Sequence, residues 1–304
     1  MNDLFSVTIR GCRGSYAKPG SQTIRYGGNT TCIEVRIADC LIILDAGTGI
    51  VSLGQELVEK HKSTGVPIVA NIFFTHIHHD HTEGFPFFEP AYFQSTTLNI
   101  FGPNTFSKAL IDVLSHAMLP PYFPVEFFEM KSKKQVQELS DGDMVALCPH
   151  KGVPKEIHTH GEKYDRSNND IILRVLHGYS HPKGGIYIYS VAYNGKKMVF
   201  ATDTEGYTGG DQRLIRFAKG ADLLIHDCQF TTETYVNPAT PRQGWGHSTV
   251  EMAVDVAKKA GVGRLVLTHH DPNDNDEKVD MKESQAKELF DSVECAREGA
   301  VYNL

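Results

Sequence analysis

The sequence predicts a layered α/β protein, on two observations. Short apolar segments alternate with helical segments, and no internal repeat or low-complexity linker divides the chain. In addition, three apolar segments end close to a potential metal ligand, namely His76, Asp203 and His269. Loops at the carboxyl ends of strands carry the chemistry of layered α/β folds, because the sheet beneath them is rigid. A chance arrangement would scatter such residues over helices and loops alike, so we expect one site formed by several strand ends.

Apolar runs and turn residues define the elements of the amino-terminal half. We expect an amphipathic helix near residues 52–62 and strands at residues 5–10, 31–37, 41–44 and 68–74. The turn after the third strand begins at Asp45, whose side chain can accept backbone hydrogen bonds, and its glycines permit a tight turn.

The carboxyl-terminal half continues this alternation. We expect strands at residues 171–176, 186–191, 198–202 and 264–268. Ser248 and Glu251 form a capping-box pattern, and the apolar stripe after them predicts a helix that ends near Gly261. Residues 149–170 are polar, and we expect them to form an exposed insertion in a single domain that spans residues 1–304.

Length and composition favour a cytoplasmic protein with one large core. A chain of 304 residues can bury such a core. It has no apolar run long enough for a membrane span, and its first residues lack the basic and apolar regions of a secretory signal. The six cysteines form no C-x-x-C pair, which fits reduced thiols better than disulfides.

The charge balance bears on the substrate. The net charge of −7 argues against a broad surface that follows the phosphates of a long nucleic acid. We therefore expect a small anionic substrate and disfavour long nucleic acid. Arg13, Lys18 and Arg25 could contact a phosphate or could be exposed loop cations.

The segment His76-Ile-His-His-Asp-His81 is the strongest chemical signal. His76 and His78 are two residues apart, so in an extended or loop backbone both side chains can converge on one metal ion. Asp80 and His81 then point toward a neighbouring position, where a second ion can share ligands from elsewhere in the chain. A solvated histidine-rich turn would explain none of the later candidates.

With these residues, the chain resembles the metallo-β-lactamase-fold hydrolase superfamily, whose pattern is H-x-H-x-D-H followed by a lone His, an Asp and a final His. The resemblance implies a four-layer αββα sandwich with two divalent metal ions. It assigns His76, His78 and His181 to one ion and Asp80, His81 and His269 to the other, with Asp203 as the bridge. His177 is the alternative to His181, and we expect it to be a partly buried histidine near a strand end. Zinc is the first expectation, and manganese or iron also suits these ligands.

A second motif narrows the chemistry. His247 lies just before a predicted helix and between glycines that fix its backbone. The segment 246–249 and the segment 222–227 resemble the branch that contains ribonuclease Z and the phosphoribosyl cyclic phosphodiesterases. In that branch an acidic residue orients the motif histidine, which makes Asp227 the candidate partner. We expect His247 to be the general acid, with Asp80 both a ligand and a member of the catalytic set. Trp245 could stack on a base or pack in the core.

The predicted function is hydrolysis of a small, possibly cyclic, phosphodiester by a hydroxide that bridges the two metals. Antibiotic hydrolysis is disfavoured, because the resemblance aligns Asp203 with a position at which the best-known zinc β-lactamases carry Cys. The alternatives are a lactonase or thioesterase of the same superfamily, an endonuclease of tRNA 3′ processing, and a protein that only stores metal. The resemblance to this branch, whose members often form dimers, also implies a homodimer.

Overall fold

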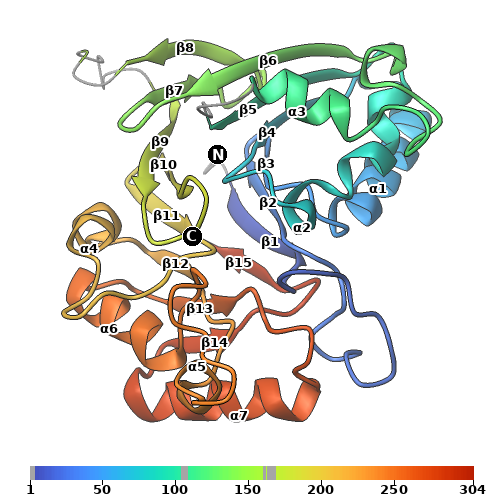
Figure 1. Cartoon of the computed structure of the whole chain (residues 1–304). Helices are drawn as coiled ribbons and strands as arrows, with labels where there is room; N and C mark the ends of the chain where they lie inside the picture. Colours follow the sequence, from blue (N-terminus) through green and yellow to red (C-terminus); the bar gives the residue numbers. More distant parts are fainter. Residues whose placement is uncertain (1–3, 104–108, 160–161, 163–168) are drawn as a thin grey trace.

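Two mixed β-sheets form the inner layers of the fold. The structure is a computed structural model, and it describes residues 4–103, 109–159, 162 and 169–304. In Figure 1 the two sheets face each other, with helices on both outer sides. The sequence prediction of an αββα sandwich is therefore confirmed.

The first sheet has the order β15-β1-β2-β3-β4-β5-β6. Its strands are β1 (Phe5–Gly11), β2 (Cys32–Ile37), β3 (Cys40–Leu44), β4 (Val69–Phe73), β5 (Thr97–Pro103), β6 (Lys133–Leu139) and β15 (Val301–Asn303). Strands β3 to β6 run parallel, so β3 and β4 end at the same edge of the sheet. Asp45 directly follows β3, and His76 lies three residues beyond the end of β4.

The second sheet has the order β14-β13-β12-β11-β10-β9-β7-β8. Its strands are β7 (Met144–Leu147), β8 (Pro154–His158), β9 (Ile171–Gly178), β10 (Ile186–Tyr193), β11 (Lys196–Ala201), β12 (Leu223–Asp227), β13 (Leu265–Thr268) and β14 (Val293–Cys295). Strands β11, β12, β13 and β14 are parallel neighbours. Their carboxyl ends bring Asp203, Asp227 and His269 to one edge.

The longer helices cover the outer faces of the two sheets (Figure 1). They are α1 (Ile50–Thr64), α3 (Leu110–His116), α4 (Gln212–Ala218), α6 (Val250–Ala260) and α7 (Asp276–Leu289). The one-turn helices α2 (His79–Thr82) and α5 (Thr232–Tyr235) lie in the segments that follow β4 and β12, and the 3₁₀ turns are η1 (Phe85–Phe87), η2 (Glu89–Tyr92) and η3 (Phe127–Glu129). Within the described ranges, no helix is both long and apolar enough to cross a membrane.

Three buried clusters hold the layers together. Alternate residues of both sheets, such as Val7 and Leu173, meet in the cluster between the sheets. The opposite faces pack under helices: Ile43 lies with Leu53 of α1, and Leu224 lies with Val254 of α6. Side chains of a strand point alternately to its two faces, so strands buried on both faces read as continuous apolar runs in the sequence.

One sequence expectation needs correction. Helix α6 is capped by Thr249, whose Oγ1 accepts from the amide of Met252 at 3.4 Å, whereas Ser248 Oγ donates to the carbonyl of Thr204 at 2.5 Å. The predicted capping box of Ser248 and Glu251 is therefore wrong by one residue. Part of the polar insertion at 149–170 is the edge strand β8, which pairs with β7. Residues 160–161 and 163–168 of that insertion lie outside the described residues.

Candidate metal centre

The first ligand group joins the loop after β4 to the loop between β9 and β10. His76, His78 and His181 each offer a ring nitrogen, and these three atoms lie within 4.8 Å of one another. His181 Nε2 and His78 Nδ1 are 3.2 Å apart. Three imidazole nitrogens this close, drawn from segments a hundred residues apart in sequence, form a pocket that a single metal ion can fill.

The second ligand group contains two carboxylates. Asp80, His81, Asp203 and His269 offer atoms that also lie within 4.8 Å of one another, and all four residues are buried. His269 Nε2 is 3.2 Å from both Asp80 Oδ2 and Asp203 Oδ1. Two acids and two imidazoles are a ligand set for a divalent transition metal.

Asp203 lies between the two groups. Its Oδ1 is 3.2 Å from His81 Nε2 in the second group. Its Oδ2 faces the first group, at 3.7 Å from His76 Nε2 and 4.0 Å from His181 Nε2. Each oxygen therefore turns toward a different cluster, which is the arrangement that a bridging carboxylate requires.

Three of the imidazoles are oriented so that Nε2 turns inward, whereas His78 presents its Nδ1 to the first group. His81 Nδ1 donates to Asp45 Oδ2 at 2.8 Å, and His76 Nδ1 donates at 3.1 Å to Thr75 Oγ1, which itself donates to Asp45 Oδ2 at 2.9 Å. His269 Nδ1 pairs with Gln229 Oε1 at 3.2 Å. When Nδ1 carries the proton, Nε2 presents its lone pair to the centre, and this is the form of imidazole that binds metal.

Two of the inward nitrogens make no hydrogen bond that meets normal geometry within the described residues, although carboxylate oxygens lie near them. His76 Nε2 and His81 Nε2 are buried and make no hydrogen bond in the described ranges. A buried polar atom without a partner is costly, typically by about 1–3 kcal/mol. A cation between these atoms would satisfy both, so the residues present fit divalent metal ions.

The pKa shifts follow the two charge environments. In the first group, burial lowers the pKa of His181 to about 4 and holds the pKa of His76 well below its ordinary value. Burial also opposes protonation of His269, but the charges of Asp203 and Asp80 outweigh it and raise the pKa of His269 to about 9. The second group therefore carries excess negative charge, and a divalent cation can replace the protons that this charge attracts.

The backbone is strained at three of these positions. Asp45, Asp203 and His269 have φ values of 63°, 49° and 60°. Residues other than glycine rarely adopt this left-handed conformation, and they keep it only where the surrounding contacts enforce it. Asp45 and His269 directly follow a strand and Asp203 lies two residues beyond one, so the left-handed backbone turns each side chain away from the direction of its strand and toward the centre.

His247 and Asp227 form a buried pair beside the ligand groups. His247 Nδ1 donates to Asp227 Oδ2 at 2.9 Å, while Asp227 Oδ1 accepts the amide of Ser248 at 2.7 Å. The ring of His247 stacks on that of His269 with centroids 4.9 Å apart. Because Nδ1 is held by the carboxylate, Nε2 is the atom of His247 that can exchange a proton.

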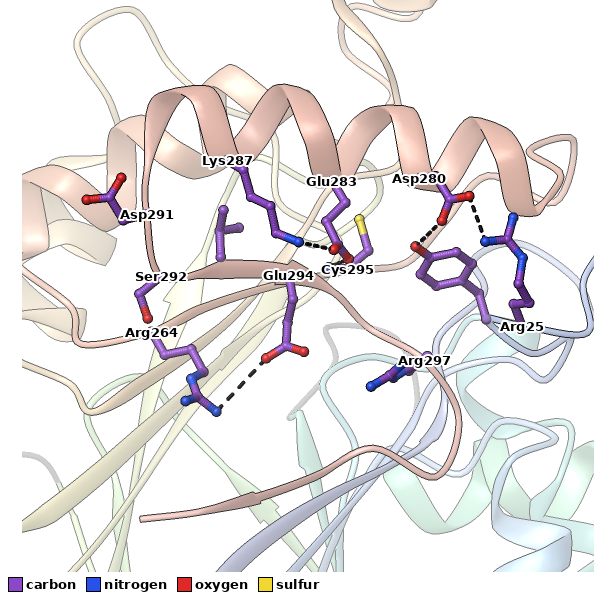
Figure 2. A pocket seen from close by; sticks show the side chains of 12 residues that line it. Arg25, Arg264, Asp280, Glu283, Lys287, Asp291, Ser292, Glu294, Cys295 and Arg297 are labelled. Atoms are coloured by element: carbon purple, nitrogen blue, oxygen red, sulfur yellow. Dashed lines mark hydrogen bonds and ion pairs between the residues drawn. The ribbon is translucent and has the colours of Figure 1, made fainter.

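A cleft of about 390 Å³ opens onto this centre. Its lining consists of Ser15, Ile77, His78, His79, Asp80, His181, Asp203, His247 and His269. Figure 2 shows a different cavity, of about 700 Å³, which lies between α7 and β14 and contains none of these residues. The charged side chains there largely pair with one another, as Lys287 does with Glu283 and Arg25 with Asp280.

Some candidates from the sequence lie elsewhere. His177 Nε2 binds the carbonyl of Gly184 at 2.8 Å, and His177 joins neither ligand group. Arg13 is fully buried, and its guanidinium binds the carbonyl oxygens of Gly27, Asp271 and Asp274. A guanidinium bound in this way stabilises loops and does not contact substrate.

Sequence reasoning missed the residues that orient the ligands. Gln229 faces His269, the amide of Ser15 donates to Asp80 Oδ2 at 2.7 Å, and Asp45 serves two histidines. Only Asp45 carried a signal, as an acid at the start of a glycine turn after a strand. A backbone amide carries no signal in a sequence at all.

Comparison with known proteins assigns the family. The model of the beta-lactamase superfamily domain matches residues 41–270. The chain belongs to this superfamily. It is 28% identical to ribonuclease Z of Thermoplasma acidophilum, over 86% of this chain and 87% of that protein. It is 27% identical to ribonuclease Z of Picrophilus torridus, over 100% of this chain and 97% of that protein.

Solved structures give the same fold. The metallo-β-lactamase fold protein YhfI from Bacillus subtilis has a TM-score of 0.66 at 21% identity and covers 99% of this chain and 100% of its own. The short form of human tRNase Z has a TM-score of 0.60 at 19% identity, with 98% of each chain covered. The predicted fold and the resemblance to ribonuclease Z are confirmed, and the chain is a metal-dependent hydrolase of the phosphodiesterase type.

The expectation about nucleic acid is wrong. The net charge of −7 led us to disfavour a long nucleic acid as substrate. The relatives that cover nearly the whole chain are nevertheless named ribonuclease Z. The physical reason is that a net charge is a sum over the whole molecule, whereas a polyanion responds to the local field at the site.

Proposed function

We propose that this protein is a ribonuclease Z-type endonuclease that hydrolyses phosphodiester bonds in RNA during tRNA 3′ processing. The observation that carries the phosphodiesterase chemistry is the His247–Asp227 pair, which stacks on His269 beside the metal ligands. An alkoxide leaving phosphorus needs a proton, and an imidazole held at Nδ1 can deliver one from Nε2. The relatives named ribonuclease Z support RNA as the substrate.

The proposed cofactors are two divalent ions, with zinc the first choice and manganese or iron as alternatives. His76, His78 and His181 would hold one ion, and Asp80, His81 and His269 the other, with Asp203 between them. When bound, such ions polarise a phosphoryl oxygen and lower the pKa of water. A solved structure of similar fold, PqqB from Methylobacterium extorquens, is a Zn²⁺-bound protein, with a TM-score of 0.61 and 14% identity.

Other residues of this chain would orient the ligands, donate a proton and attract the phosphate. Asp45 and Gln229 keep the inward nitrogens aimed at the centre. Asp227 accepts a hydrogen bond from His247 Nδ1 and so leaves Nε2 as the nitrogen that delivers the proton. His247 protonates the departing oxygen. The two carboxylates Asp80 and Asp203 would only partly offset the charge of two divalent ions, so a site that held them would be cationic and would attract a phosphate even though the whole protein is acidic.

One assay series tests this function. Purified protein is offered a precursor tRNA with a 3′ extension, bis(p-nitrophenyl) phosphate, cyclic nucleotides and a lactone. We expect the highest kcat/KM on the precursor tRNA and measurable turnover of bis(p-nitrophenyl) phosphate. Hydrolysis of cyclic nucleotides without cleavage of the precursor would refute RNA as the substrate. Activity on the lactone alone would refute the phosphodiesterase chemistry.

Variants assign the roles in the same assay. His247→Ala should lower kcat by about 10²–10⁴-fold, the usual contribution of a general acid. Asp203→Ala should lose both bound metal and turnover. His116→Ala is the matched control, because His116 lies on α3 and binds the carbonyl of Asp112. Unchanged turnover of the precursor by His247→Ala would contradict the assigned role.

A further inference from the structure

The loop before His247 is fixed by one carboxylate. Glu205 Oε1 accepts the amide of Gly244 at 2.8 Å, and its Oε2 accepts the amide of Gly246 at 2.9 Å. Glu205 Oε1 also accepts the hydroxyl of Tyr235 at 2.5 Å. Both amides that flank Trp245 are thus bound to the same side chain, which fixes the position of the residue between them.

The side chain that this loop presents is exposed. Trp245 is 52% exposed, so it does not pack in the core, although apolar aromatic rings are usually buried. The guanidinium of Arg242 lies over its ring, with its central carbon 4.1 Å from the centroid. The backbone supports this pair, because the amide of Trp245 donates to the carbonyl of Arg242 at 3.1 Å.

The guanidinium of Arg242 has no carboxylate partner within the described part of the chain, so it forms no ion pair there. Its Nε is buried without a hydrogen-bond partner, while the residue as a whole is partly exposed, so any contact with a ligand would be made by its terminal nitrogens. A guanidinium that is stacked on an aromatic ring keeps its edge free for a phosphate or a base. The two side chains therefore combine a flat apolar surface with an available cation.

The segment that carries Trp245 adjoins the metal centre. The carbonyl of Gly246 lies 3.4 Å from His181 Nδ1, and His247 lines the cleft over the ligands. Trp245 precedes His247 by two residues, so their Cα atoms are at most about 7 Å apart. The phosphate and the base of one nucleotide are separated by a comparable distance, and this match makes the ring a candidate contact for the base of a nucleotide bound at the centre.

We propose that Trp245 and Arg242 form a stacking subsite for the nucleobase of a nucleotide next to the scissile phosphate. The inference rests on the proposed function, since it names how RNA would be held at the same centre. Aromatic side chains stack on any base, because every base has a π face, so the subsite gives affinity without strong sequence preference. Arg242 fixes the ring and adds charge for the adjoining phosphate.

A fluorescence titration tests binding without any turnover. Trp245 is the single tryptophan of the chain, so the tryptophan emission reports on this position alone. We expect adenosine and cytidine monophosphates to quench it saturably and ribose 5-phosphate, which lacks a base, to leave it unchanged. Equal quenching by ribose 5-phosphate, or none by the nucleotides, would overturn the proposal. This readout is independent of hydrolysis, so it separates failure of the subsite from failure of the proposed function.

A double-mutant cycle tests the subsite during cleavage by combining Trp245→Ala with removal of one base from the RNA. Trp245→Ala should lower kcat/KM about 10-fold on an RNA with a normal base beside the cleavage site, mainly through KM. On the same RNA with an abasic residue at that position, Trp245→Ala should have little effect, because the partner of the ring is already absent. Equal losses on both RNAs would mean that Trp245 acts only on the structure of the loop.

Two further variants serve as controls. Trp245→Phe keeps an aromatic face and should restore most of the activity that Trp245→Ala loses. Phe128→Ala removes another exposed aromatic ring, 69% exposed, which lies on η3 over the other sheet. It should leave both substrates unaffected, and a loss comparable to that of Trp245→Ala would contradict the proposal.

Discussion

At the scale of single residues, Asp45 controls two imidazoles at once. Its Oδ2 accepts from His81 directly and from His76 through Thr75, and its Oδ1 accepts the amide of Thr75 at 2.7 Å. All these groups are buried, so each hydrogen bond is made in a medium of low polarity where an alternative partner is absent. The orientation of both nitrogens thus depends on one carboxylate that contacts no metal.

Asp45→Asn should therefore weaken metal binding without removing a ligand. The amide keeps the shape of Asp45 but replaces one acceptor oxygen with a donor, so it cannot accept from His81, from the hydroxyl of Thr75 and from the amide of Thr75 together. We expect metal affinity to fall about 10–100-fold, as for other groups that orient ligands. Titration of apo protein with zinc and a competing chelator measures this. Asp39→Asn, an exposed change in the turn before β3, is the control, and equal affinity of Asp45→Asn and wild type would contradict the assignment.

At the scale of elements, parallel strands and close-packed loops decide which side chains meet. Strands β11, β12 and β13 end side by side, which places Asp203, Asp227 and His269 at one edge. The loop at Gly246 then closes against His181. Gly246 has a φ of +90°, and a Cβ there would lie 2.2 Å from His181 Nδ1. Only glycine fits between this loop and the ligand.

Gly246→Ala should accordingly displace His181 or His247. A misplacement of about 1 Å can cost roughly 10²-fold in rate, and we expect kcat to fall by at least that much. Gly209→Ala separates this clash from backbone strain, because Gly209 has a similar φ of +84° and nothing within 4 Å of its added Cβ. Steady-state kinetics and metal content are measured for both. Comparable losses in the two variants would show that strain, and not the contact with His181, is responsible.

At the scale of the whole molecule, the ligands come from both sheets. His76, His78, Asp80 and His81 follow strand β4 of the first sheet, while His181, Asp203 and His269 belong to the second. Metal ions held between them would link the two halves of the sandwich. They would also neutralise buried carboxylates that otherwise stay close together.

Removal of metal should for this reason destabilise the entire fold. A ligand that binds only the folded state at 100 times its Kd contributes about 2.7 kcal/mol of stability. For a chain of this size we expect chelation to lower Tm by about 5 °C, and zinc to restore it. Scanning calorimetry with and without chelator measures the shift. Asp203→Ala should show no such difference, and an unchanged Tm of the wild type would argue against metals that connect the sheets.

Local sequence patterns anticipated much of this molecule, and the exceptions have identifiable causes. The expected strand at residues 5–10 is β1 (Phe5–Gly11), and the helix expected near residues 52–62 is α1 (Ile50–Thr64). The cap of α6 was misplaced, because Ser248 and Thr249 have equal capping chemistry and the contact of Ser248 with Thr204 decides between them. The expectation of a small substrate and no long nucleic acid failed because the net charge of a sequence does not show where on the folded surface the charges lie.

The fold and the candidate ligands of this protein could be predicted from its sequence, because both follow from the spacing of apolar, histidine and aspartate residues along the strands. Three features became visible in the three-dimensional arrangement alone: which oxygen of Asp203 faces which cluster, that Asp45 and Gln229 orient the imidazoles, and that Trp245, two residues before His247, is exposed. These are relations between segments distant in the chain. They depend on packing and hydrogen-bond geometry in three dimensions, which no local pattern of residues encodes.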